Sequence, residues 1–379
     1  MTDRTDCCLL RLMACALNGV PPREDSLAEV DLSQLLALAR KHSVAAMVCM
    51  ALEDTQAFAQ AEKEIRRQWL EAKNRAIRKN MLMDAEYREV CQELERRGIR
   101  YLPLKGSVLK DWYPRCGMRE RADVDILIDP EKREQVKQLF LGRGYRVVSY
   151  AREVHDVYQK PPVYNFEMHA ALFGVTAEEL TSRWVEPQLL PVPGKSFARR
   201  LSNEDFYVYF LAHAWKHYRD GGTGLRTLAD VYVLERQLGA SLNRDDVCQA
   251  LRRLDILDFA QQTWALAQKL FGGELPLTER EQAVLSPFLE AGTYGNLDLR
   301  VTNRLRRLQG GQTSFTRSTK LRYLWSRIFI PAEVLKISYP ALARHPWLYP
   351  LFWAWRLPYK AVTRWGVMCR ELAVLRSSK

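Results

Sequence analysis

Two aspartates alternate with apolar residues in the segment 123–129, DVDILID. Side chains of a β-strand point alternately to its two faces, so Asp123 and Asp125 project to the same side. Val124, Ile126 and Ile128 then face a core. Two carboxylates this close repel each other unless a cation lies between them. The spacing therefore indicates a divalent metal site.

A second strand-like run, residues 163–172 (VYNFEMHAAL), carries Glu167 and His169. By the same alternation these two residues share a face with Asn165. A third carboxylate on a neighbouring strand would complete a three-acid site, and oxygen ligands close to phosphates are what Mg²⁺ prefers. Alternatively, Glu167 could neutralise a buried arginine such as Arg119. We favour metal binding, because Glu167 lies within an otherwise apolar strand.

Upstream of the aspartates, the segment 104–107 reads Leu-Lys-Gly-Ser, where a strand-like run meets the start of a helix. Backbone N–H groups at such a junction favour a phosphate, and the Ser107 hydroxyl can add a hydrogen bond. Lys105 and Arg119 lie beside this junction in the predicted arrangement. They are either contacts to a triphosphate or ordinary surface cations.

A later helical segment contains HAWKH, in which His213 and His217 are four residues apart and share a face. This spacing is similar to that of a zinc helix, but the glutamate of HExxH is missing and no third ligand is evident. We expect the histidines to form a polar cluster with Arg226 and Asp230, or to line a substrate pocket. Arg226 and Asp230 could also simply pair along their own helix.

Together these motifs resemble the nucleotidyltransferase superfamily related to DNA polymerase β. Its signature is an apolar residue before Gly-Ser, then Asp-x-Asp on a strand, then a third acid on a later strand. The closer resemblance is to a family of uncharacterised bacterial nucleotidyltransferases. That family has a Leu-Lys-Gly segment, an arginine four residues before Asp-x-Asp, a Glu-x-His strand, a helix with spaced histidines and an Arg-x-x-x-Asp pair. The matching residues are Leu104, Lys105, Gly106, Arg119, Asp123, Asp125, Glu167, His169, His213, His217, Arg226 and Asp230.

The resemblance, which covers roughly residues 25–340, implies a Mg²⁺-dependent enzyme. Such an enzyme transfers a nucleoside monophosphate from a nucleoside triphosphate such as ATP to an acceptor hydroxyl and releases pyrophosphate. The implied catalytic residues, which would hold two Mg²⁺ or Mn²⁺ ions, are Asp123, Asp125 and Glu167. The implied nucleotide-binding residues are Lys105, Gly106, Ser107 and Arg119. Residues expected to contact substrate or to support the site are His169, His213, His217, Arg226 and Asp230. The base for the acceptor proton would be Glu167 or His169.

The order of predicted elements indicates an α+β fold, with a small mixed β-sheet nucleotidyltransferase core flanked by N-terminal and C-terminal helical regions. We expect an N-terminal helical region over residues 1–97 and an α/β core over residues 98–200. A helical domain over residues 201–300 and a basic, aromatic-rich region over residues 301–379 would follow.

The net charge of +12 is unevenly distributed. Residues 301–379 contain fifteen lysines and arginines but only two acids, a net charge of +13, and five of the ten tryptophans. This asymmetry indicates an anionic partner, either nucleic acid or a membrane surface. The eleven uncharged residues 345–355 are too few to span a bilayer, so we expect no transmembrane segment. The simpler alternative is that the tryptophans pack on the helical domain.

The eight cysteines are scattered without CxxC pairs, so reduced thiols in a cytoplasmic protein are expected. The basic C-terminal region leaves open a location peripheral to the membrane. The alternative to an enzyme is a non-catalytic protein that binds nucleic acid or a membrane surface on a degenerate nucleotidyltransferase fold.

Overall fold

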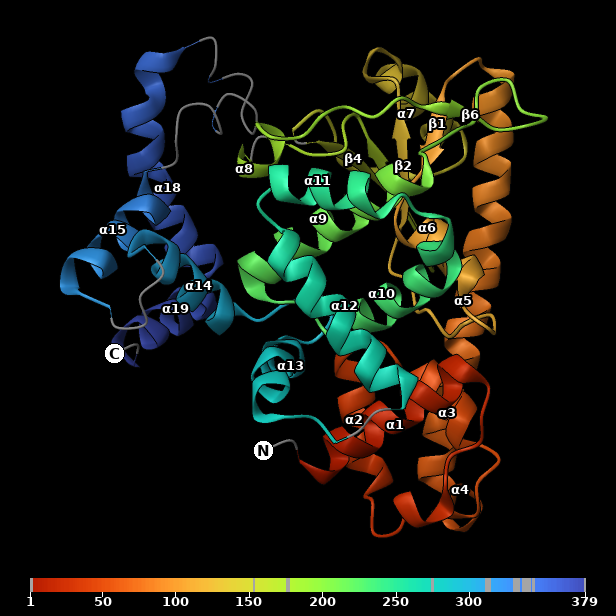
Figure 1. The fold of residues 1–379 in the computed structure, drawn as a ribbon. Helices are drawn as coiled ribbons and strands as arrows, with labels where there is room; N and C mark the ends of the chain where they lie inside the picture. The colour runs from red at the N-terminus through yellow and green to blue at the C-terminus, as the bar shows by residue number, and fades with distance from the viewer. Residues whose placement is uncertain are drawn as a thin grey trace.

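The computed structural model describes residues 3–152, 154–174, 178–273, 276–310, 315–329 and 345–377, together with Leu335 and Leu342. A small mixed β-sheet is flanked by helices from both ends of the chain, as Figure 1 shows. The predicted α+β class is therefore confirmed.

The main sheet has five strands in the order β1-β2-β5-β4-β3. These strands are β1 (Tyr101–Pro103), β2 (Val124–Ile128), β3 (Arg146–Ser149), β4 (His155–Lys160) and β5 (Tyr164–His169). β2 and β5 are parallel, whereas the other neighbours are antiparallel. One face of β2 and β5 is buried against α5 (Lys63–Arg96) and α7 (Arg133–Gly142), and Phe140 of α7 contacts the ring of Phe166. This burial of one face leaves the polar side chains of both strands on the other.

The N-terminal helices are α1 (Arg4–Asn18), α2 (Leu32–Lys41), α3 (Ala45–Leu52), α4 (Gln56–Gln60) and α5 (Lys63–Arg96). Asp3 caps α1 through a capping box, and Gly19 ends it in the left-handed conformation. The 34-residue α5 runs along one side of the molecule from these helices to the sheet (Figure 1). It therefore connects the helical end of the protein with the strands that carry the acids.

The middle helices are α9 (Asn203–Gly221), α10 (Leu225–Leu238), α11 (Arg244–Arg253), α12 (Leu257–Gly272) and α13 (Glu279–Ala291). Buried side chains of α1, including Leu9 and Met13, belong to the same apolar core as Leu228 of α10 and Leu266 of α12. Helices from distant parts of the sequence thus share one core. Short elements connect the rest: α6 (Gly106–Leu109), α8 (Glu178–Thr181), β6 (Leu190–Pro191) and β7 (Arg199–Arg200).

The C-terminal helices are α14 (Leu297–Leu308), α15 (Arg317–Ile328), α18 (Tyr349–Thr363) and α19 (Trp365–Ser377). They form a small core of their own from Val301, Leu305, Tyr323 and Leu375. The expectation that the tryptophans pack on the helical domain is wrong for most of them. Four are more than half exposed: Trp325, Trp347, Trp355 and Trp365. None of the described helices combines the length and the apolar character needed to cross a bilayer.

Candidate active site

A cavity of about 460 Å³ lies where the sheet meets α9 and α10. Of the twelve residues predicted to form the site, eleven line this cavity. The exception is Ser107, which is buried within α6 and is absent from the lining. The chain thus brings together, around one cavity, residues as far apart in sequence as Lys105 and Asp230.

The pairing of β2 with β5 positions the acids. Asp125 is directly opposite Glu167 in the parallel register, so the two side chains lie on the same face of the sheet. Asp123 lies immediately before β2 and is partly exposed, whereas Asp125 is buried. Asp125 and Glu167 therefore lie on adjacent strands, and Asp123 directly precedes one of these strands.

Asp125 binds two side chains through the same oxygen. Lys105 Nζ and His169 Nε2 each lie 2.8 Å from Asp125 Oδ1. Burial alone would raise the pKa of Asp125, but Lys105 and His169 hold it below its ordinary value. Burial and the neighbouring Asp125 instead raise the pKa of Asp123. The two aspartates therefore differ in environment, and Lys105 supplies a cation that this acid pair requires.

Lys105 is held in an unusual backbone conformation between β1 and α6, with φ of 46° and ψ of −118°. A positive φ is a region that side-chain-bearing residues rarely adopt, and it costs roughly 1–3 kcal/mol. Burial would lower the pKa of the Lys105 ammonium, but the Asp125 carboxylate raises it above its ordinary value. The strained backbone thus holds a charged ammonium group inside the cavity.

His155 completes a cluster that the sequence reasoning missed. The β4–β5 register pairs His155 with His169, and Glu167 Oε2 lies 3.6 Å from His155 Nε2 and 3.9 Å from His169 Nε2. One ligand atom from each of the three residues lies within 4.8 Å of the others. Imidazole and carboxylate donors at these separations can hold one divalent ion. The sequence signal for this cluster is weak: His155 stands at the start of β4, the strand before the one that carries Glu167.

Arg119 is buried in an ion pair with α10. Its Nε and Nη2 atoms donate to the two Asp230 oxygens at 2.7 and 2.9 Å, and the Tyr113 hydroxyl donates to Asp230 at 2.7 Å. Arg119 is therefore not an ordinary surface cation, and its carboxylate partner is Asp230 rather than Glu167. The alternative pairing of Arg226 with Asp230 is also absent from these hydrogen bonds, because Arg226 donates to the Glu120 carbonyl at 2.9 Å.

Gly106 is required by its contact with Arg119. A Cβ atom at position 106 would lie 2.3 Å from Arg119 Nη1, far inside van der Waals contact. α6 is only four residues long, so its N-terminus alone makes no strong phosphate site. In the segment 104–107, Lys105 and Gly106 are the residues that reach the cavity.

The two histidines of α9 form the opposite wall. His213 Nε2 and His217 Nε2 lie 3.3 Å apart, and the rings meet edge to face. Burial lowers the pKa of His213 well below its ordinary value. His213 is therefore neutral near pH 7 and offers an uncharged imidazole to the cavity, whereas Lys216 of the same helix adds a cation to the lining.

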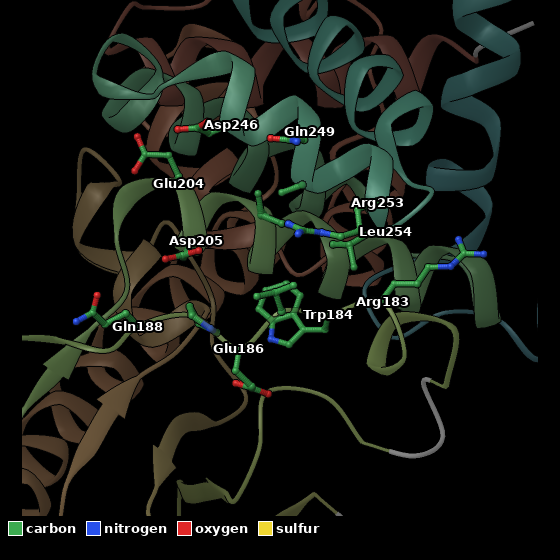
Figure 2. Close-up of a pocket in the computed structure, with 14 residues that line it drawn as sticks. Arg183, Trp184, Glu186, Gln188, Glu204, Asp205, Asp246, Gln249, Arg253 and Leu254 are labelled. Atoms are coloured by element: carbon green, nitrogen blue, oxygen red, sulfur yellow. The ribbon is translucent and has the colours of Figure 1, made fainter.

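A second cavity, of about 320 Å³, lies between α9, α11 and residues 183–188. Figure 2 shows Trp184 and Arg253 near its centre, with the acidic side chains of Glu204 and Asp246 at one end. None of the predicted site residues lines it. The candidate active site is therefore the cavity at the sheet.

The sequence matches the model of a family described as uncharacterised nucleotidyltransferases over residues 28–272. The chain belongs to this nucleotidyltransferase family. All twelve predicted site residues fall inside the matched range. No curated protein and no solved structure matches the chain. Membership in the nucleotidyltransferase family supports a general role in nucleotidyl transfer with a nucleotide as a substrate.

Proposed function

We propose that the protein is a metal-dependent nucleotidyltransferase that moves a nucleoside monophosphate from a nucleoside triphosphate to an acceptor hydroxyl and releases pyrophosphate. The arrangement of Asp125 beside Glu167, at one cavity with Asp123, carries the proposal. Cationic Lys105 and Arg119 line the same cavity, as a substrate with a triphosphate requires. Family membership supports the same reaction class.

The donor groups fit divalent cations. Asp123, Asp125 and Glu167 offer the oxygen ligands that Mg²⁺ takes, and two ions is the number that we propose. His155 and His169 beside Glu167 also suit an ion that accepts nitrogen ligands, such as Mn²⁺. A bound divalent ion stabilises negative charge on the phosphate and on the attacking oxygen.

The other residues of the cavity are proposed to bind the triphosphate and the acceptor. Lys105 and Arg119 line the cavity beside their carboxylate partners, Asp125 and Asp230. We propose that both contact the triphosphate, and that Lys105 exchanges its contact with Asp125 for a phosphate oxygen. Gly106 lets the backbone approach without a side chain. Ser107 is buried in the short α6 turn beside them, where its backbone N–H donates to the Leu104 carbonyl at 3.0 Å. His213, His217 and Arg226 line the side on which we propose that the acceptor lies.

Glu167 is the better of the two proposed bases. The Nε2–H of His169 donates to the Asp125 carboxylate, so its second nitrogen, Nδ1, is the free acceptor; that atom is buried away from the cavity solvent. The Glu167 side chain is 23% exposed and can reach a substrate hydroxyl. We expect Glu167→Gln to lower turnover far more than nucleotide affinity. If Glu167→Gln lowered only nucleotide affinity, we would assign the role of base to His169 instead.

A screen with the four nucleoside triphosphates, each labelled at the α-phosphate, tests the reaction class. We expect Mg²⁺-dependent transfer of label from one of them to a component of a cell extract. Asp123→Asn is the control, and label transfer by this variant at the wild-type rate would contradict the proposal. Recovery of the labelled product would identify the acceptor.

The C-terminal region supports a second role beside catalysis, which we propose to be docking on an anionic membrane surface. Leu351, Trp355, Tyr359 and Val362 follow each other at helical spacing on α18, and all are between 52% and 84% exposed. Basic residues exceed acidic ones in this region, as the net charge of +13 over residues 301–379 shows. Aromatic side chains beside cations suit a lipid interface better than an aqueous surface.

A further inference from the structure

A third cavity, which we call the basic cavity, adjoins the candidate active site. It has a volume of about 270 Å³ and lies between α2, α5, the start of α3 and the segment before β2. Arg121, Arg226 and Tyr294 line both this cavity and the active-site cavity. A ligand in one cavity therefore lies close to a ligand in the other.

The basic cavity is lined by five cationic side chains and one acidic side chain. The cations are Arg40, Arg75, Lys79, Arg121 and Arg226. The acid is Glu120, whose carboxylate already accepts a hydrogen bond of 3.0 Å from the Ala46 N–H at the start of α3. Burial also raises the pKa of Glu120. The cavity thus has a strong excess of positive charge, which attracts anions.

Arg121 has a hydrogen-bond donor with no acceptor within the described part of the chain. This residue is only 5% exposed, and its Nη2 atom donates to Asp84 at 2.6 Å. Its Nη1 atom is also buried and has no hydrogen-bond partner among the described residues. A buried guanidinium donor without a partner costs free energy. Because Arg121 lines both cavities, an anion that reached this donor would satisfy it.

Lys79 connects this cavity electrostatically to the acids. Burial lowers the pKa of the Lys79 ammonium, and the Asp123 carboxylate acts in the opposite direction. A desolvated ammonium binds an oxyanion more strongly than one in water. Lys79 and Arg75 come from one face of α5, because they are four residues apart.

We propose that the basic cavity binds a phosphate group while a nucleotide occupies the neighbouring metal-binding cavity. The proposal rests on the proposed function and adds a substrate class to it. The phosphate belongs either to a phosphate-bearing acceptor or to the nucleotide itself. In the first case the reaction joins a nucleoside monophosphate to a phosphorylated compound.

Equilibrium binding of inorganic phosphate and pyrophosphate, without metal, tests the cavity with the intact protein. The test variant is Arg75→Ser/Lys79→Ser, and the matched control is Arg78→Ser/Arg88→Ser, which removes the same charge from exposed positions of α5. Circular dichroism first verifies that both fold. We expect the test variant to bind these anions at least about tenfold more weakly and the control to stay within about threefold of wild type.

Equal binding by wild type and the test variant would overturn the proposal, and so would an equal loss in the control, because net charge alone would then explain it. A repeat with saturating Mg²⁺ and a non-hydrolysable nucleoside triphosphate distinguishes the two phosphate sources. Undiminished binding assigns the cavity to an acceptor phosphate, whereas competition assigns it to the nucleotide. If no triphosphate binds to wild-type protein, the proposed function fails, while the metal-free measurement still decides whether the cavity binds phosphate.

Discussion

Lys105 Nζ lies 2.8 Å from Asp125 Oδ1, so the chain itself supplies a cation for its buried acid pair. Lys105 is held there by a backbone with a φ of 46°. A lysine in this conformation costs free energy, which the contact of its ammonium with Asp125 offsets. We interpret this contact as the arrangement of the ligand-free protein. Lys105 would stabilise the Asp125 carboxylate until a metal ion binds to Asp125 and a triphosphate binds to Lys105.

The backbone conformation of Lys105 gives a test by two truncations. Lys105→Ala and Lys105→Gly both leave Asp125 without its ammonium, which costs about 3–5 kcal/mol in the free energy of unfolding. The glycine variant should be the more stable of the two by about 1 kcal/mol, because only alanine retains the strain of a Cβ at positive φ. Urea denaturation measures the difference. A glycine variant no more stable than the alanine variant would show that the backbone is not strained.

The contact between Gly106 and Arg119 predicts a coupled effect. Gly106→Ala places a methyl group against Nη1 of Arg119, so the guanidinium must shift. We expect its hydrogen bonds to Asp230 to be weakened or lost, at a cost of up to about 3 kcal/mol. In an Arg119→Met background the same change should cost much less. A double-mutant cycle in the free energy of unfolding measures this coupling. Additive effects would contradict the contact.

Buried His42 predicts part of the pH dependence of stability. Its Nδ1 atom accepts a hydrogen bond from the Leu225 N–H, and burial lowers its pKa to about 4 from an ordinary value of 6.5. Between these values the unfolded chain binds a proton that the folded protein does not. Stability is therefore lost as the pH falls from about 6.5 towards 4, by on the order of 3 kcal/mol.

His42→Gln keeps an acceptor for Leu225 but does not titrate. The free energy of unfolding of this variant should fall less steeply than that of wild type over the same pH range. The difference between the two curves isolates His42 from other histidines with a lowered pKa, such as His213, which act in the same direction. Parallel curves would show that folding does not lower the pKa of His42.

The exposed face of α18 predicts salt-resistant binding to anionic vesicles. Trp355→Ser/Tyr359→Ser should weaken this binding by at least about tenfold at high salt, since each ring loses apolar area that lipid would cover. Trp264→Ser, at a 41% exposed position of α12, is the control. Vesicle sedimentation and tryptophan emission measure the effect. Equal binding by the double variant would exclude this face, and binding to RNA alone, lost at high salt, would indicate nucleic acid instead.

Much of the site follows from local sequence patterns. Alternation on a strand places Asp123 and Asp125 on one side, and the α+β order of elements follows from changes in apolar spacing. The partners of these residues do not follow, because they depend on tertiary packing. Arg119 meets Asp230 only after α10 packs against the segment before β2, and His155 meets Glu167 only through the β4–β5 register. The exposure of Trp355 likewise depends on tertiary packing, because packing decides which side of each C-terminal helix stays uncovered.

Metal-dependent nucleotide binding by Asp123→Asn tests the central claim most directly. Asp123 is preferable to Asp125 for this purpose, because its removal leaves the Lys105 contact intact. Calorimetric titration with ATP, GTP, CTP and UTP, each with and without Mg²⁺ or Mn²⁺, gives the affinities. We predict that wild type binds at least one of the four triphosphates, and that this binding requires a divalent ion. Folded Asp123→Asn should bind the same triphosphate at least about 100-fold more weakly. Equal metal-dependent affinity in wild type and Asp123→Asn would contradict the account.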